Sequence, residues 1–322
     1  MIDMRRQFLS VAALAFLLTG CSKTDGGLDN FPEDRVIRVA TEVETMTKGS
    51  YTTGSLTDFD LAVAGMNSRY SYDNIQFTKN SDGAWTPESL MLWENSEAFV
   101  DIFALAPSNP SVKFRPGAQT PVNVSVQEVQ TEADNTSDVL YWGKTGFQPK
   151  RDLVEGKIAI EFRHVMSKLK LTLRLGTEFN LGGVPNANPI SELKISGTSL
   201  SAQCGWGDNY SYDELSLYPD SKSVKDMAPY LAAWRPGADE KTNCYAEYEC
   251  ILVPQTVGAN TLAVSFKAGD KTYSWKLPSQ LVFEKNTVYT LTLQVGKDFL
   301  IAGEISASPW DQTQGPEDMF TD

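Results

Sequence analysis

Histidine is nearly absent from this sequence of 322 residues, in which His164 is the single imidazole. Catalytic triads, histidine-ligated zinc sites and acid–base relays depend on imidazole groups, so the chain has little material for them. The G-x-S-x-G, H-E-x-x-H, Walker A and G-x-G-x-x-G motifs are also missing. The sequence therefore predicts a protein that is not an enzyme, with no cofactor and no metal site. His164 is interpreted as a structural imidazole with a hydrogen-bond partner.

Basic side chains are few as well. The chain has 28 Lys and Arg against 41 Asp and Glu, which gives a formal net charge of −13. A protein that follows nucleic-acid phosphates needs a basic surface to displace counterions, so this balance argues against nucleic acid as a partner. At 41% hydrophobic residues the chain can nevertheless bury substantial cores.

Cysteine is limited to four residues, Cys21, Cys204, Cys244 and Cys250. On one strand, Cys244 and Cys250 would lie about 20 Å apart, too far for a disulfide unless the chain turns between them. Two interpretations of the last three cysteines remain open: one disulfide with a spare thiol, or three buried thiols.

Long hydrophobic runs are limited to the start of the chain. Arg5 and Arg6 precede an apolar stretch from Phe8 to Leu18, which is shorter than the roughly 20 residues that span a bilayer as a helix. This pattern predicts a secretory signal peptide over residues 1–20. The sequence Leu18-Thr19-Gly20-Cys21 is typical of a lipobox, so Cys21 is the predicted lipidation site. The alternative is an ordinary signal that happens to end at a cysteine.

The residues after Cys21 favour the outer membrane. Ser22 replaces the aspartate that tends to hold lipoproteins at the inner membrane, which predicts a lipoprotein exposed on the surface of the outer membrane. Ser22 to Asn30 is polar and contains Gly26 and Gly27, so we expect a flexible tether over residues 21–31.

The rest of the chain is dominated by a hydrophobic period of two, which is typical of half-buried β-strands. Apolar residues alternate over 158–162, 169–175 and 289–295, and a hairpin is predicted around Gly269. Frequent Gly, Pro and Asn turn signals favour antiparallel sandwiches. The sequence thus predicts an all-β fold with two β-sandwich domains in tandem. Their predicted bounds are 32–145 and 157–322, with a linker at 146–156.

Several segments resemble those of the fimbrillin-like (Mfa-like) family, the type V pilins of Gram-negative anaerobes. Phe162–Leu169 is similar to their F-x-H-x-x-S-K-L segment, and Leu252–Thr256 resembles their x-P-Q-T strand end. Asn286–Leu291 resembles the closing G-x-x-Y-t-l hairpin, with asparagine in place of glycine, and Ser308–Trp310 resembles the terminal x-x-W. The resemblance implies two transthyretin-like Greek-key sandwiches and a fimbrial subunit.

The resemblance also implies assembly by strand exchange. A protease removes the first strand, and a strand from another subunit fills the groove that is left, as strand addition at an open sheet edge allows. Here the first strand would run from Arg35 to Val43, with Ile37, Val39 and Thr41 on one face. Lys48 stands where the family often has the arginine that is cleaved.

The implied donor segment runs from Phe299 to Ala307, with Phe299, Ile301 and Ile305 as anchors. The alternative is that this segment is simply the last strand of the second domain. The resemblance makes other fimbrial subunits, the same or related, the expected partners, with the outer membrane contacted through the lipid and a host protein or glycan as a further ligand.

A second hypothesis is a surface lipoprotein that does not polymerise and binds glycans or host ligands through exposed aromatic side chains. The tryptophans that would stack on sugar rings are Trp85, Trp93, Trp206 and Trp234. Packing of these side chains in the cores or between the domains is the competing interpretation.

Overall fold

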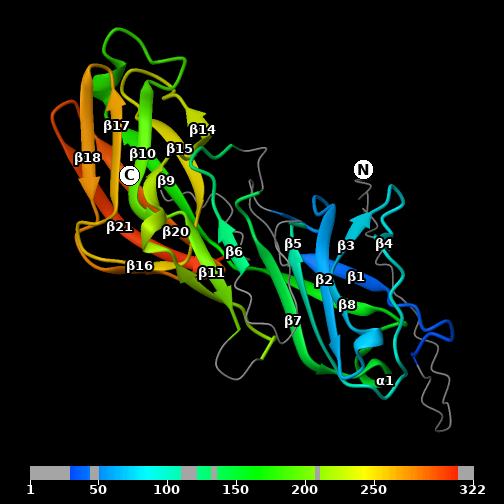
Figure 1. Ribbon diagram of the computed structural model, residues 1–322. Helices are drawn as coiled ribbons and strands as arrows, with labels where there is room; N and C mark the ends of the chain where they lie inside the picture. Colours follow the sequence, from blue (N-terminus) through cyan, green and yellow to red (C-terminus); the bar gives the residue numbers. More distant parts are fainter. Residues whose placement is uncertain (1–29, 44–50, 110–121, 132–135, 207–210, 311–322) are drawn as a thin grey trace, which may run out of the picture.

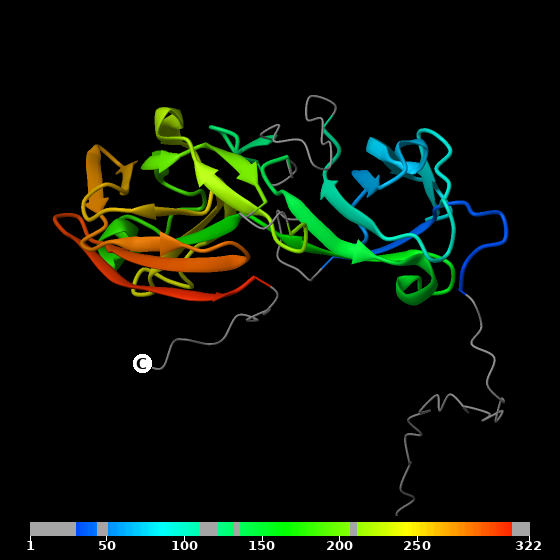
Figure 2. The same cartoon turned by 60° about the horizontal axis from the view of Figure 1, so that its bottom comes forward.

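The computed structural model describes residues 30–43, 51–109, 122–131, 136–206 and 211–310. These ranges form two β units placed next to each other (Figures 1 and 2). Within them the helical structure is α1 (Pro149–Asp152) and three 3₁₀ turns, η1 (Ser68–Tyr70), η2 (Thr177–Asn180) and η3 (Ser221–Ser223). None of these described helices has the length and apolar character needed to cross a membrane. The predicted all-β fold is confirmed.

The first unit is built on one seven-stranded sheet, with the strand order β1-β8-β7-β5-β2-β3-β4. Neighbouring strands are antiparallel except β1 and β8, which are parallel. The strands of this sheet are β1 (Val39–Val43), β2 (Asp58–Gly65), β3 (Tyr72–Lys79), β4 (Trp85–Pro87), β5 (Val100–Ala106), β7 (Leu140–Phe147) and β8 (Ile158–His164).

This sheet curls around its own apolar face. Phe59 on β2 is fully buried, and its ring centroid lies 5.1 Å from that of Phe77, 4.8 Å from that of Trp85 and 5.5 Å from that of Phe162. Because Trp85 and Phe162 belong to strands far apart in the strand order, both can contact one ring only if the sheet folds over. The two edges also approach each other, since Nε1 of Trp85 on β4 donates to Oγ1 of Thr41 on β1 at 3.0 Å. The period-two pattern buries one face of each strand and so forms this core.

The second unit contains a five-stranded sheet, β14-β15-β9-β20-β21, and sheets of four, three and two strands in the orders β13-β10-β17-β18, β12-β11-β6 and β16-β19. Its strands are β6 (Val122–Ser125), β9 (Ser167–Leu175), β10 (Ile190–Ser199), β11 (Ser201–Gly205), β12 (Ser216–Pro219), β13 (Val224–Met227), β14 (Tyr230–Arg235), β15 (Cys244–Leu252), β16 (Gln255–Val257), β17 (Ala263–Ala268), β18 (Lys271–Lys276), β19 (Leu281–Phe283), β20 (Thr287–Val295) and β21 (Leu300–Pro309).

The structure corrects the predicted domain boundaries. The linker predicted at 146–156 is a connection inside the first sheet: it joins β7 to β8 through α1, and β8 pairs with both β7 and β1. The Gly, Pro and charged residues of this stretch are typical of a linker between domains. In this fold they form a helical turn at the rim of the sheet. Conversely, β6 lies within the predicted bounds of the first domain, but it pairs with β11 of the second unit. The chain therefore crosses between the units three times, after β5, after β6 and after β8.

The two units share an apolar contact. Phe103 on β5 faces away from the first core and stacks on Tyr212, with ring centroids 5.3 Å apart. The hydroxyl of Tyr141 donates to the carbonyl of Tyr212 at 2.5 Å and accepts from Nε1 of Trp206 at 2.9 Å. At Gly143 a Cβ atom would lie 1.7 Å from the carbonyl oxygen of Tyr212, so only glycine allows this approach.

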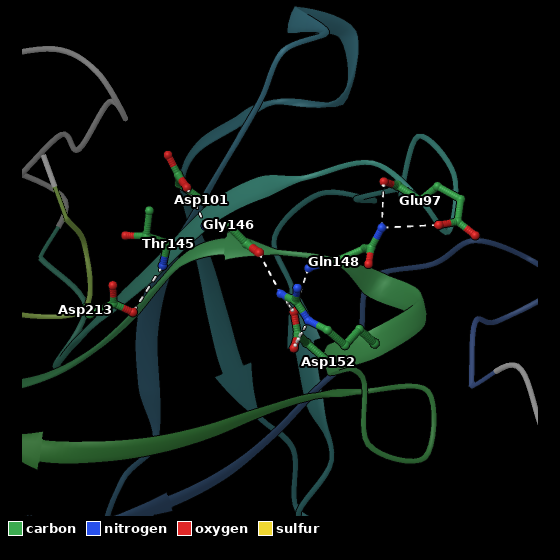
Figure 3. A network of polar contacts seen from close by, with 8 residues as sticks. Glu97, Asp101, Thr145, Gly146, Gln148, Asp152 and Asp213 are labelled. Carbon is green, nitrogen blue, oxygen red and sulfur yellow. Dashed lines mark hydrogen bonds and ion pairs between the residues drawn. The ribbon is translucent and has the colours of Figure 1, made fainter. Parts of the chain in front are cut away.

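A polar network orders the end of β7 beside this contact (Figure 3). The amide of Gly146, which has a φ of 62°, donates to Oδ1 of Asp101 at 2.8 Å, and the amide of Thr145 donates to Asp213 at 3.3 Å. At the start of α1 the amide of Gln148 donates to Oδ2 of Asp152 at 2.7 Å. The turn is thus fixed by carboxylates that satisfy backbone groups, as expected at a short helix.

Candidate assembly site

β1 lies at one edge of the first sheet. It pairs in parallel with β8, from Val39 opposite Ile158 to Val43 opposite Phe162, and β8 is its one strand neighbour in the described chain. An edge strand can leave its sheet without breaking a second row of ladder hydrogen bonds. This is the position that strand exchange requires of a strand that is to be removed.

The side chains of β1 and of the residues just before it fill the first core. Ile37, Val39 and Val43 are 1%, 7% and 3% exposed. Thr41, on the same face, is half-buried and bonded to Trp85. Burial of an aliphatic side chain of this size contributes roughly 1.5–3 kcal/mol. These positions are therefore apolar slots that must be occupied for the core to be complete.

The ends of this strand are held by further hydrogen bonds. The amide of Ile37 donates to the carbonyl of Met91 at 3.0 Å, and the amide of Val43 donates to Oγ1 of Thr53 at 2.9 Å. Of the sequence-predicted positions, Cys21 and Lys48 lie outside the described residues. Residues 44–50, which include Lys48, join the end of β1 to Tyr51 in the sequence.

β21 lies at the edge of the five-stranded sheet, antiparallel to β20. Phe299, just before the strand, and Ile301 within it are 52% and 54% exposed, while Ile305 is half-buried against the second core. The predicted donor segment is thus the last strand of the second unit in the free chain. It is also an edge strand that presents two large apolar side chains to solvent.

A buried polar cluster lies where the chain crosses from β8 to β9. Oδ2 of Asp138 accepts from the amide of Tyr51 at 2.7 Å, and its Oδ1 lies 2.9 Å from Nδ1 of His164. A carboxylate only accepts, so Nδ1 carries the proton of this bond. The ring of His164 stacks on Trp310, with centroids 4.5 Å apart and an interplanar angle of 8°. The predicted structural role of His164 agrees with this geometry.

The F-x-H-x-x-S-K-L segment forms this crossing. Phe162, His164, Ser167, Lys168 and Leu169 are all buried. Ser167 donates through Oγ to the carbonyl of Glu284 at 2.7 Å, and Lys168 forms an ion pair with Glu249. Burial lowers the pKa of the Lys168 ammonium, and Glu249 opposes this shift. His164, Ser167 and Lys168 thus each have a polar partner from a distant part of the chain, which explains these residue types at this spacing.

The three described cysteines are free and buried, so the second of the two interpretations of the cysteines holds for this structure. Burial raises the pKa of the Cys204 thiol to about 12 and also raises the pKa of Cys250. In a chain that begins at Ser22, we expect no native labelling of Cys204 or Cys250 by a disulfide-exchange reagent at pH 8, because the thiolate is the reactive form. Denaturant should expose both residues to labelling. Rapid labelling of either thiol in the folded chain would contradict this assignment.

The four tryptophans of the glycan hypothesis are not exposed. Trp93 is 2% exposed and stacks on Phe147, and Trp206 packs between the units against Phe103. Trp85 and Trp234 are half-buried. Packing within and between the units thus buries much of each of these side chains, as the competing interpretation predicted.

No set of three or more His, Cys, Asp or Glu side chains in the described ranges is placed to hold a metal ion. The cluster of Tyr51, Asp138, His164 and Trp310 was not predicted beyond the structural role of His164. The terminal x-x-W resemblance, the resemblance of Asp138–Tyr141 to the family's D-l-l-y segment and the single histidine are the sequence signals that pointed to its members.

An all-β chain of two packed units, with an edge strand close to each end, belongs with the tandem β-sandwich proteins. The model of the fimbrillin-like family matches residues 41–310, which is most of the chain. The chain therefore belongs to the fimbrillin-like family.

Three solved structures have a similar fold. A protein from Bacteroides uniformis assigned to cell adhesion aligns over 87% of this chain and 99% of its own, with a TM-score of 0.57 and 14% identity. One from Bacteroides ovatus with the same assignment aligns over 87% and 99%, with a TM-score of 0.56 and 15% identity. A fimbrial protein from Bacteroides vulgatus aligns over 86% and 99%, with a TM-score of 0.51 and 15% identity. No protein with a curated description matches the sequence significantly.

Proposed function

We propose that the chain is a lipid-anchored subunit of an adhesive fimbria on the cell surface, and that it assembles with the same or related subunits by donor-strand exchange. Cleavage after Lys48 would free β1, and the segment Phe299–Ala307 of a neighbouring subunit would take its place. The family and the fimbrial and adhesion assignments of the similar structures support a fimbrial role at the cell surface.

The observation that carries this proposal is the position of β1. The strand is at an edge, it supplies alternate apolar side chains to the core, and Lys48 follows it five residues later in the sequence. At roughly 1.5–3 kcal/mol for each buried aliphatic side chain, the cut strand stays bound until another strand fills its slots. Exchange is therefore expected to be slow and to need a donor with apolar residues at alternate positions.

The test uses the chain from Ser22, with the recognition sequence of a specific protease placed at Lys48. The uncut protein should remain monomeric, and the cut protein should form a ladder of oligomers on size-exclusion chromatography. Ile301→Asn and Ile305→Asn should remove the ladder, whereas the matched control Val282→Asn, at an exposed position on β19, should retain it. Cut protein that stays monomeric with an intact C-terminal segment would contradict strand exchange.

The lipid anchor has its own test. Mass spectrometry of the protein from intact cells should show an acylated Cys21 in the unprocessed form and a start at Gly49 in the processed form. Two or three acyl chains would hold the precursor stably, since one chain alone binds a membrane only marginally. An unacylated N-terminus before or at Cys21 would contradict the anchor.

A further inference from the structure

The last strand is lightly packed onto its own unit. From Phe299 to Pro309 every side chain whose exposure is described is half-buried or exposed. In contrast, β1 and the residue two positions before it place three side chains in the first core. Leu300, Ala302 and Ile305 pack against the second core but stay partly open to solvent, so β21 is held by its backbone pairing with β20 and by these partial contacts. Backbone pairing at a solvent-exposed edge opens readily.

Trp310 is the exception at the end of this strand. Its side chain is 0% exposed, its ring stacks on His164, and its amide donates to the carbonyl of Asn286 at 3.0 Å. A buried tryptophan contributes a large apolar surface together with the ring stacking. Trp310 is thus the one fully buried side chain at this end of the strand among the described residues, and it lies at the junction of the two units.

Each ring of the stack has one nitrogen without a hydrogen bond. Nε1 of Trp310 and Nε2 of His164 are buried and have no hydrogen-bond partner in the described chain. A buried polar atom that lacks a partner is destabilising, since water would satisfy it. Withdrawal of the indole would hydrate Nε1 and open a route for water to Nε2, which offsets part of the lost apolar contact. The contact between Trp310 and His164 therefore holds the strand and can also open reversibly.

We propose that Trp310 is a latch: its indole on His164 retains β21 on its own subunit, and its withdrawal frees the segment Phe299–Ala307 for a neighbouring subunit. This inference rests on the proposed donor role of β21. His164 is also hydrogen-bonded through Asp138 to Tyr51, the first described residue after Lys48 in the sequence. The latch thus sits on the same cluster that holds the chain directly after the predicted cut.

Hydrogen exchange on the uncut chain tests the latch. Trp310→Ala should speed exchange of the β21 amides about tenfold or more, while the amides of β9, at the centre of the same sheet, exchange as before. Trp310→Phe keeps a flat apolar ring over His164 and should retain most of the protection. The matched control Trp93→Ala removes a buried tryptophan that stacks on Phe147 in the first unit, and it should leave β21 unchanged.

Equal acceleration in β9 and β21, or none in β21, would overturn the latch, because Trp310 would then be an ordinary core residue. If Trp310→Ala fails to fold, Trp310→Leu, which keeps apolar volume without a flat ring, is judged by the same comparison. The measurement is made on uncut monomer, so it decides the latch independently of polymerisation. The failure of cut protein to form oligomers would instead count against the proposed function.

Discussion

Replacement of Phe59 by alanine is expected to lower the free energy of unfolding of the first unit by about 3–5 kcal/mol. The ring is fully buried and contacts Phe77, Trp85 and Phe162, which come from three other strands of the curled sheet. Its removal leaves a cavity at the point where the sheet folds over, and strands on both sides of the core lose contacts. Urea unfolding followed by circular dichroism measures the change.

Phe299→Ala is the control for this substitution. It removes the same atoms from a position that is 52% exposed. Surface substitutions away from special features usually change stability by no more than about 0.5 kcal/mol. If the two variants lost similar stability, the packing assigned to Phe59 would be wrong.

Asp138→Ala is expected to destabilise the chain by about 3 kcal/mol or more, since buried groups that lose a hydrogen-bond partner cost about 1–3 kcal/mol each. The fully buried carboxylate accepts from the amide of Tyr51 and from the ring of His164. Thermal and urea unfolding of the variant measure the loss. Hydrogen exchange should show the Tyr51 amide exchanging faster.

Two further variants serve as controls for the Asp138→Ala measurement. Asp138→Asn keeps one acceptor oxygen and should lie between the wild type and the alanine variant. Asp270→Ala removes an exposed carboxylate in the turn between β17 and β18 and should change stability by no more than about 0.5 kcal/mol. A neutral Asp138→Ala variant would show that the buried cluster does not stabilise the junction.

Local sequence patterns predicted the strands well. The alternation of apolar residues over 158–162, 169–175 and 289–295 corresponds to β8, β9 and β20, because a strand with one buried face imposes a period of two. Asn286, which stands where the family often has glycine, adopts a φ of 53°, a conformation that asparagine tolerates. These features depend on residues close in sequence.

Features that depend on distant residues were predicted poorly. The turn at 146–156 has the same composition whether it joins two strands of one sheet or two domains, so the boundary was misplaced. The pairing of β6 with β11 places Val122 opposite Cys204, with β7, β8, β9 and β10 between them in the sequence, and no local pattern encodes it. The polar cluster was missed for the same reason, since Tyr51, Asp138, His164 and Trp310 are widely separated along the chain.

The three crossings between the units have a mechanical consequence. In a tandem protein with one linker, a pull on the two ends stretches that linker first. Here β6 follows β5 and precedes β7 of the first unit in the sequence, but it pairs with β11 of the second unit. The connection from β8 to β9 is lined with buried side chains. Tension along a filament would therefore have to shear paired strands before the units could separate. Such a subunit should transmit force as one stiff body rather than as two units joined by a flexible linker.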